Sequence, residues 1–115
     1  MGYSKKIVYR NRALINDDIY VTGNLGDSFM GLQILKNKIK VSKELKNYFT
    51  QKYYLPDIQI KLTKKLLNFA NSSIDLSDGL IDDLSKMLNS QNLSFTLYEN
   101  KIPISKNLLL SLIHI

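Results

Sequence analysis

NSSIDLSDGLIDDL, residues 71–84, combines a short apolar run, two spaced carboxylates and a glycine. The carboxylates are Asp75 and Asp78, with Ser77 between them, and Gly79 permits a sharp turn. Apolar residues then recur at helical spacing, namely Leu80, Ile81, Leu84, Met87 and Leu88. The pattern predicts a strand, an acidic turn and a helix. Such a turn presents oxygen ligands at the end of a strand, where open α/β sheets tend to bind phosphate ligands with Mg²⁺.

The composition excludes several kinds of site. The 115-residue chain has no cysteine, so disulfides, thiolate zinc sites and cysteine nucleophiles are ruled out. Its one histidine, His114, disfavours a Ser-His-Asp triad, and we expect it to be a surface residue without a role. No apolar run is long enough to cross a bilayer and no signal peptide is evident, so we expect a cytoplasmic protein without a membrane partner.

The net charge of +6 comes almost wholly from lysine. Surfaces that bind nucleic acids usually add arginine and exposed aromatic residues on one basic face. Here arginine occurs only at Arg10 and Arg12, and the lysines are spread along the chain. We therefore interpret the lysines as a solvated surface and expect no nucleic-acid partner.

The order of elements predicts a mixed αβ chain. Strands are expected at residues 18–22, 73–76 and 94–98, where β-branched and aromatic residues cluster or alternate. Helices are expected at residues 29–36, 42–53, 63–70, 80–89 and 105–115. Asp27 or Ser28 suits the N-cap of the first helix, and Ser105 that of the last.

Three segments, in this order, carry a family resemblance. The first is Tyr9-Arg10 followed by DDIYVTG at residues 17–23. The second is LGDS at residues 25–28, with Gly31-Leu32 after it. The third and most specific is ANSSIDLSDGL at residues 70–80, continuing to Asp83-Leu84. Together they resemble thiamine-monophosphate kinases, of the superfamily that includes aminoimidazole ribonucleotide synthetase and selenophosphate synthetase.

The resemblance implies an α+β fold, with helices packed on one face of a mixed sheet. Residues 1–16 would be the linker and tail of a missing N-terminal domain. Residues 17–115 would be an incomplete C-terminal domain of the aminoimidazole ribonucleotide synthetase-like fold. The full-length family implies a homodimer, and a separately encoded N-terminal half is a further possible partner.

The implied activity is transfer of the γ-phosphoryl group of ATP to thiamine monophosphate, which gives thiamine diphosphate. By the resemblance, Asp75 and Asp78 would hold Mg²⁺, while Arg10 and Ser77 would contact the nucleotide. Phosphoryl transfer depends on positioning and charge neutralisation, so no nucleophilic side chain is required and no catalytic residue is assigned.

Other interpretations stay open at this point. Residues 75–78 could simply cap the following helix, and Arg10 by itself would more often be a surface cation. Residues 26–28 suit a helix cap better than a phosphate loop, and Asp82 and Asp83 are expected to face water.

The function has alternatives as well. After Arg10, residues 11–16 lack the Lys-Pro-Gly turn that is usual in the family. The chain could therefore be a non-catalytic remnant or one half of a split enzyme. A third alternative keeps the superfamily but changes the substrate, for instance to that of a purine-pathway ligase.

Overall fold

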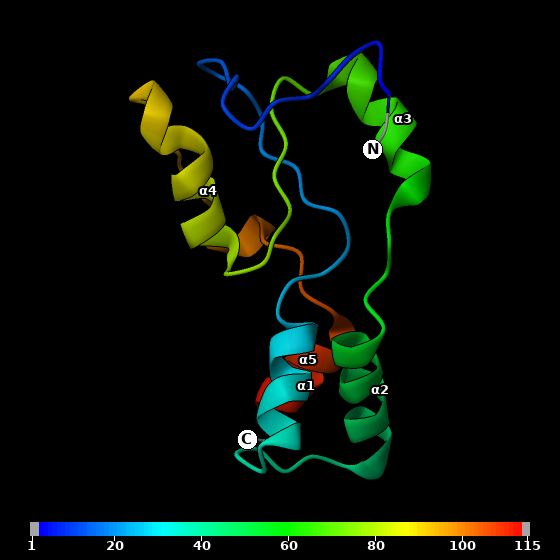
Figure 1. Cartoon of the computed structure of the whole chain (residues 1–115). Coiled ribbons are helices and arrows are strands. Elements are labelled where there is room, and N and C mark those ends of the chain that lie inside the picture. The colour runs from blue at the N-terminus through cyan, green and yellow to red at the C-terminus, as the bar shows by residue number, and fades with distance from the viewer. Residues whose placement is uncertain (1–2, 114–115) are drawn as a thin grey trace. The chain divides into compact units, whose positions relative to one another are not determined.

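The computed structural model describes residues 3–113, so His114 lies outside the described residues. Helices joined by extended segments make up this part of the chain (Figure 1). The α-helices are α1 (Asp27–Leu35), α2 (Lys43–Tyr54), α3 (Ile60–Phe69), α4 (Leu80–Leu88) and α5 (Lys106–Ile113), and the short 3₁₀ helices are η1 (Asn89–Gln91) and η2 (Glu99–Lys101). Each predicted helix is confirmed to within a few residues, and none of those described is long and apolar enough to cross a membrane.

The predicted mixed sheet, and with it the α+β class, is wrong. Residues 18–22, 73–76 and 94–98 form no strand in the described chain. One isolated parallel bridge joins Tyr9 and Ser72, where the Ser73 amide donates to the Tyr9 carbonyl at 3.2 Å. Along residues 92–98, half-buried and exposed residues do alternate. Alternating exposure shows only which side chains are covered by the rest of the protein. A strand also needs a second backbone segment with which to form hydrogen bonds.

A side chain bonds to the backbone at Ala13 in the way that a strand partner would. The Ala13 amide donates to Oε1 of Gln91 at 3.1 Å, and Nε2 of Gln91 donates back to the Ala13 carbonyl at 2.8 Å. The amide of Gln91 therefore satisfies the two groups that a neighbouring strand would satisfy, because a carboxamide carries the same donor and acceptor as a peptide bond.

The chain divides into two compact units. The α3–α4 unit combines the residues up to Ile19 with Gln59–Thr96, and the α1–α2–α5 unit combines Tyr20–Ile58 with the residues from Leu97 onward. The boundary predicted at residue 16, between the tail of one domain and the start of another, stays a prediction.

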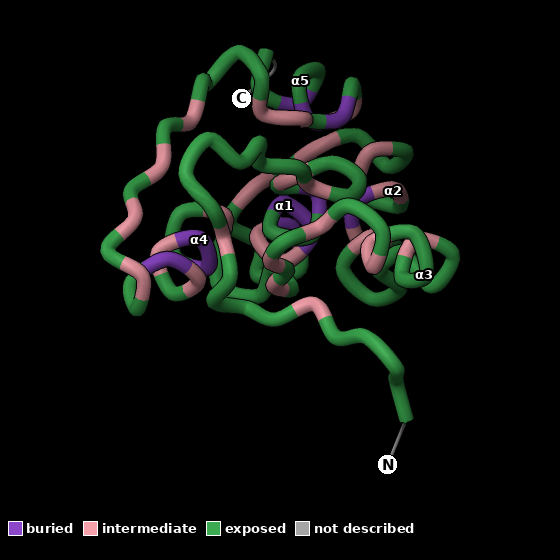
Figure 2. The backbone as a smooth tube through the Cα atoms, turned by 90° about the horizontal axis from the view of Figure 1, so that it is seen from above, coloured by how far each residue is buried: buried purple, intermediate pink, exposed green. Residues whose placement is uncertain are grey.

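The α1–α2–α5 unit holds a small apolar core. Met30 and Ile34 from α1, Phe49 from α2 and Leu108 from α5 form one buried cluster. Figure 2 shows these buried positions on the labelled helices, and further buried positions on α4. Burying each such side chain contributes about 1.5–3 kcal/mol relative to leaving it exposed.

Gly31 allows α1 and α2 to pack closely. A Cβ atom at this position would lie 2.3 Å from the Phe49 carbonyl oxygen and 2.9 Å from Cβ of Tyr53. Backbone atoms cannot move aside as the end of a flexible side chain can. The helix pair therefore depends on the missing side chain.

Asp27 joins the three helices of this unit. Its side chain is buried, with the residue only 5% exposed, and Oδ1 accepts from the Ser105 hydroxyl at 2.6 Å. Oδ2 accepts from the Tyr48 hydroxyl at 2.9 Å. The Ser105 Oγ also accepts from the Leu108 amide at 3.0 Å, which confirms Ser105 as a helix cap. One carboxylate thus connects α1, α2 and the start of α5.

The predicted N-cap of α1 is wrong. Neither Asp27 nor Ser28 caps it; Gly26 occupies the cap position with φ of 92° and no side-chain hydrogen bond. Asp27 is drawn inward by its two hydroxyl donors, and Ser28 donates to the Lys52 carbonyl at 3.0 Å. A buried carboxylate needs such donors more than a helix end needs a cap, because the helix end can be hydrated.

We expect Gly31→Ala to destabilise the α1–α2–α5 unit by about 1–3 kcal/mol, as overpacking typically does. The effect opposes helix propensity, which favours alanine over glycine by about 1 kcal/mol. Urea unfolding measures it, and Phe29→Ala is the control, because Phe29 lies in the same helix but is 66% exposed. A stabilised Gly31→Ala variant would contradict the close helix contact.

Ser105→Ala should lower the free energy of unfolding by about 2–4 kcal/mol, because it removes a cap and leaves Oδ1 of Asp27 without its donor. Ser42→Ala is the matched control: Ser42 caps α2 by accepting from the Leu45 amide at 3.3 Å and has no buried acid to satisfy. We expect about 1 kcal/mol for Ser42→Ala. Urea unfolding measures both variants. An equal loss of unfolding free energy for Ser105→Ala and Ser42→Ala would refute the proposed contribution of the hydrogen bond from Ser105 to Asp27.

Candidate functional site

The acidic turn before α4 is shaped by Gly79 and Asp83. Gly79 has φ of 137° and ψ of 157°, a region that is essentially restricted to glycine. Oδ2 of Asp83 accepts from the backbone amides of Ser77 at 2.8 Å, Asp78 at 3.0 Å and Gly79 at 3.2 Å. A carboxylate in the first turn of the helix therefore reaches back and holds the preceding turn.

This arrangement corrects two expectations. Within the described chain, the side chains of Asp75, Ser77 and Asp78 make no capping hydrogen bond to α4, so the capping interpretation is wrong. The expectation that Asp83 faces water is also wrong, because the residue is only 1% exposed, whereas Asp82 is exposed as predicted. The backbone amides of the turn attract Asp83 inward because they would otherwise lack an acceptor.

These contacts lower the pKa of Asp83. The hydrogen bond from the Ser77 amide is the largest cause, and the Gly79 amide, Lys86 and the Asp78 amide act in the same direction. Together they outweigh burial and bring the pKa of Asp83 from 3.8 to about 2. Asp83 is therefore ionised in the folded chain at neutral pH.

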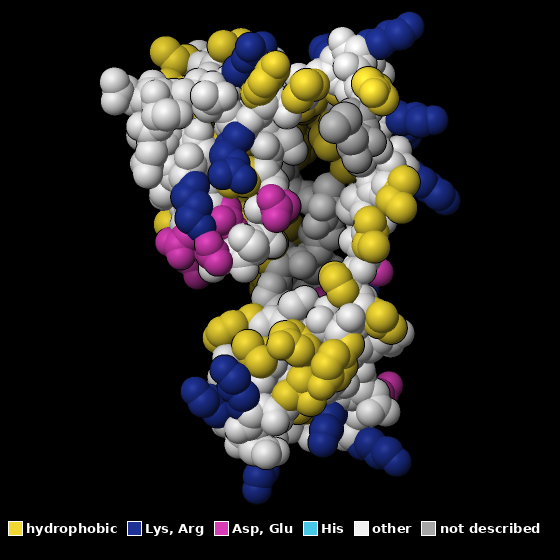
Figure 3. Space-filling model, viewed as in Figure 1, with side chains coloured by type: hydrophobic (Ala, Val, Ile, Leu, Met, Phe, Trp, Pro, Cys, Tyr) yellow, Lys and Arg dark blue, Asp and Glu magenta, His cyan; other side chains and the backbone are white. Residues whose placement is uncertain are grey.

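Lys86 connects the two carboxylates of the turn. Its Nζ forms an ion pair with Oδ2 of Asp78 and lies 3.2 Å from Oδ1 of Asp83. The hydrogen bond to Asp78, followed by that to Asp83, raises the pKa of Lys86. The Asp78 side chain stays 62% exposed, and Figure 3 shows acidic side chains beside basic ones on the unit that carries α4. Asp78 and Asp83 thus direct one oxygen each at a single cation in a place open to solvent.

The structure brings the first and third matched segments together. The bridge between Tyr9 and Ser72 places the segment of Arg10 beside the start of residues 71–84, and the Arg12 amide donates to Oγ of Ser72 at 2.7 Å. Nδ2 of Asn71 donates to both carboxylate oxygens of Asp17 at 3.0 Å. The second segment, residues 25–28, belongs to the α1–α2–α5 unit.

The predicted site residues, Arg10, Asp75, Ser77 and Asp78, are all exposed. Among the described side chains, no hydrogen bond or ion pair joins Arg10 to Asp75, Ser77 or Asp78. Asp75 likewise makes no ion pair in this part of the chain. Their roles toward nucleotide and metal stay predictions.

The donor set of the turn fits magnesium only together with phosphate. Within residues 3–113, no three or more acidic, histidine or cysteine side chains form a group that could hold a metal ion. Mg²⁺ commonly takes one or two carboxylates and completes its shell with water and phosphate oxygens. Asp75 and Asp78 are the exposed carboxylates of the turn that could supply such a pair, whereas the Asp83 side chain is only 2% exposed.

Sequence reasoning missed Asp83 and Lys86. The signal was present, because residues three apart on a helix lie on one face, and Asp83 and Lys86 have this spacing. The reach of Asp83 back to the amides of residues 77–79 depends on the turn conformation, which the sequence alone does not specify.

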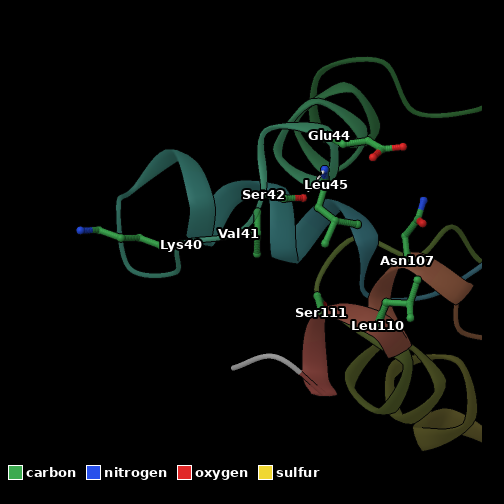
Figure 4. Close-up of a pocket in the computed structure, with 8 residues that line it drawn as sticks. All are labelled: Lys40, Val41, Ser42, Glu44, Leu45, Asn107, Leu110 and Ser111. Carbon is green, nitrogen blue, oxygen red and sulfur yellow. Dashed lines mark hydrogen bonds between the residues drawn. The ribbon is translucent and has the colours of Figure 1, made fainter.

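A pocket of about 410 Å³ lies within the α1–α2–α5 unit (Figure 4). Leu45 from α2 and Leu110 from α5 extend toward each other across it, with Glu44 and Asn107 beside them, whereas Lys40 points away. The pocket contains none of the predicted site residues.

Comparison with known proteins identifies no family: no family model matches the chain, and no curated protein is significantly similar to it. The resemblance to thiamine-monophosphate kinases therefore rests on the residues quoted above.

We expect the stability supplied by Asp83 to be present above pH 4 and to be lost as the pH falls toward 2. The reason is that the unfolded carboxyl takes up its proton near 3.8, whereas the folded one does so near 2. Asp83→Asn should remove this part of the acid dependence of unfolding, and Asp82→Asn, at the exposed neighbour, should not. A carboxyl carbon titration by NMR that places Asp83 near 4 would contradict the assignment.

Proposed function

We propose that the acidic turn serves ATP- and Mg²⁺-dependent phosphorylation of thiamine monophosphate to thiamine diphosphate. The observation that carries the proposal is the geometry of the turn: Asp78 is exposed and projects from a backbone that the buried Asp83 holds in place. The proposal rests on these residues and on the three ordered segments.

Each residue has a proposed part. Asp75 and Asp78 would hold Mg²⁺, and the Ser77 hydroxyl would donate a hydrogen bond to a phosphate oxygen. Arg10 would form a bidentate contact with a phosphate. When bound, Mg²⁺ supplies neutralisation of the charge on the transferring phosphoryl group. The parallel contact of Tyr9 with Ser72 supports this assignment, because it keeps the Arg10 segment beside the segment that leads into the turn.

The alternative is that the chain is a non-catalytic remnant or one half of a split enzyme. Two observations favour it. Asp78 is engaged by Lys86, and α5 leaves large apolar side chains exposed: Leu112 by 57% and Ile113 by 75%. Exposed apolar groups of this kind often mark a surface that a second protein covers. A homodimer, or association with a separately encoded N-terminal half, would cover such a surface and is proposed on the same grounds.

The test measures ATP–Mg²⁺ binding by isothermal titration and thiamine diphosphate formation from thiamine monophosphate. We expect Asp78→Asn to lower Mg²⁺-dependent product formation by about a hundredfold, the order seen when one charge-stabilising group is removed. Asp57→Asn is the matched control, because Asp57 also pairs with a lysine, Lys52 at 2.6 Å, but lies in the α1–α2–α5 unit.

The outcomes separate the alternatives. Full activity of Asp78→Asn would exclude the magnesium role. No binding and no product from the wild-type chain, with both restored by a separately expressed N-terminal half of a thiamine-monophosphate kinase, would establish the split enzyme. Product formed from a purine-pathway substrate, but not from thiamine monophosphate, would support an ATP-dependent reaction at this site with a different substrate.

A further inference from the structure

We propose that α3 binds to the surface of an anionic lipid bilayer, with its apolar side toward the acyl chains and its lysines among the phosphate headgroups. The helix contains none of the predicted site residues, so the proposal does not depend on the kinase activity. It replaces the expectation that the chain has no membrane partner. A helix that lies flat on a bilayer needs an apolar stripe, whereas only a helix that crosses one needs a long apolar run.

The sequence of α3 separates apolar from basic side chains. Apolar residues recur at helical spacing along one side of the helix, and these are Ile60, Leu62, Leu66, Leu67 and Phe69. The opposite side is polar and carries Lys61, Lys64, Lys65 and Asn68. No acidic residue occurs in the helix. An apolar side combined with a lysine-rich polar side is the pattern of helices that lie at a membrane interface.

The apolar side of α3 is only partly covered by the described chain. Ile60 is 70% exposed and Phe69 is 60% exposed, while the three leucines between them are half-buried. No residue of α3 is buried, whereas each of the other described α-helices buries at least one residue. An amphipathic helix of a globular protein normally turns its apolar side to a core. In α3 that side remains available to a partner.

The charge around α3 indicates an anionic partner. Nζ of Lys6 donates to the Leu67 carbonyl, so a further lysine lies against the C-terminal part of the helix. The acidic residues of the same unit belong to other segments, residues 17–18 and 75–83. In Figure 3, basic side chains project over α3 and the acidic ones of this unit gather elsewhere. A second copy of this surface would be repelled, whereas anionic headgroups would be attracted.

The position of two lysines favours a bilayer over a protein groove. Lys64 lies one helical turn after Ile60, and Lys65 lies one turn before Phe69. Each exposed apolar residue therefore has a lysine beside it at the border of the apolar side. A lysine stem can lie along apolar surface while its amino group stays among headgroups, so this border matches the boundary between headgroups and acyl chains. A protein would need an apolar channel with acidic groups along both rims.

The test measures binding of the full chain to vesicles by cosedimentation. Vesicles of phosphatidylcholine with phosphatidylglycerol are compared with vesicles of phosphatidylcholine alone. We expect binding to the anionic vesicles, and we expect it to weaken as salt is raised, because salt screens the attraction. The double variant Lys64→Gln/Lys65→Gln should lower the partition coefficient by about 25-fold, since each lysine near an anionic surface contributes about fivefold.

Two matched controls locate the contact on α3. Lys36→Gln/Lys38→Gln removes the same charge at exposed positions of the other unit and should change the partition coefficient little. Because the chain has no tryptophan, Phe69→Trp introduces a single reporter on the apolar side. Its fluorescence should shift to the blue on anionic vesicles, whereas Phe29→Trp, at a position 66% exposed in α1, should show no shift. Circular dichroism shows whether each variant keeps its helices.

Several results would overturn the inference. One is the absence of binding to anionic vesicles, and another is equal binding to neutral and anionic vesicles. An equal loss for the two double variants would mean that net charge alone, and not α3, attracts the chain. Binding to polyglutamate without binding to anionic vesicles would assign α3 to an acidic protein partner instead of a membrane.

Discussion

A carboxylate that is buried must be given hydrogen-bond donors, and both units of this chain are arranged around that requirement. Asp27, in the first turn of α1, takes two hydroxyl groups from α2 and the start of α5. Asp83, in the first turn of α4, takes three backbone amides and a lysine. An ionised group without these donors would not remain inside the protein. The two hydroxyl groups come from residues distant along the chain and the three amides from the preceding turn, so satisfying the charge also fixes the local fold.

The helices could be predicted because they depend on information within a short stretch of chain. The apolar spacing after Gly79 and the cap at Ser105 are local features, and the structure agrees with both of them. The strands could not be predicted in the same way, since residues 94–98 alternate as a strand does but have no partner backbone. Pairing is a property of two segments, and a single stretch of sequence does not contain it.

The candidate site shows the same division. The exposure of Asp75, Ser77 and Asp78 and the turn at Gly79 agree with what the sequence indicates. The inward position of Asp83 does not, because a run of two aspartates at a helix start is typical of groups that face water. Only the turn conformation, with three amides directed at one point, distinguishes Asp83 from its exposed neighbour Asp82. Asp83 organises the turn, and its burial was therefore the feature that the pattern of charges did not indicate.

The extended segments have a consequence for how long the chain would persist in a cell. Proteases bind their substrates as extended backbone, and a strand within a sheet is protected because its hydrogen-bonding groups are already engaged. Residues 94–97 form no strand pairing within the described chain, although Phe95 and Leu97 are half-buried. Cleavage there would detach α5, and with it the Ser105 hydroxyl that Asp27 needs. Degradation of the protein would then begin at this connection. The core of the α1–α2–α5 unit would be destabilised next, because Asp27 would lose the hydroxyl donor of Ser105.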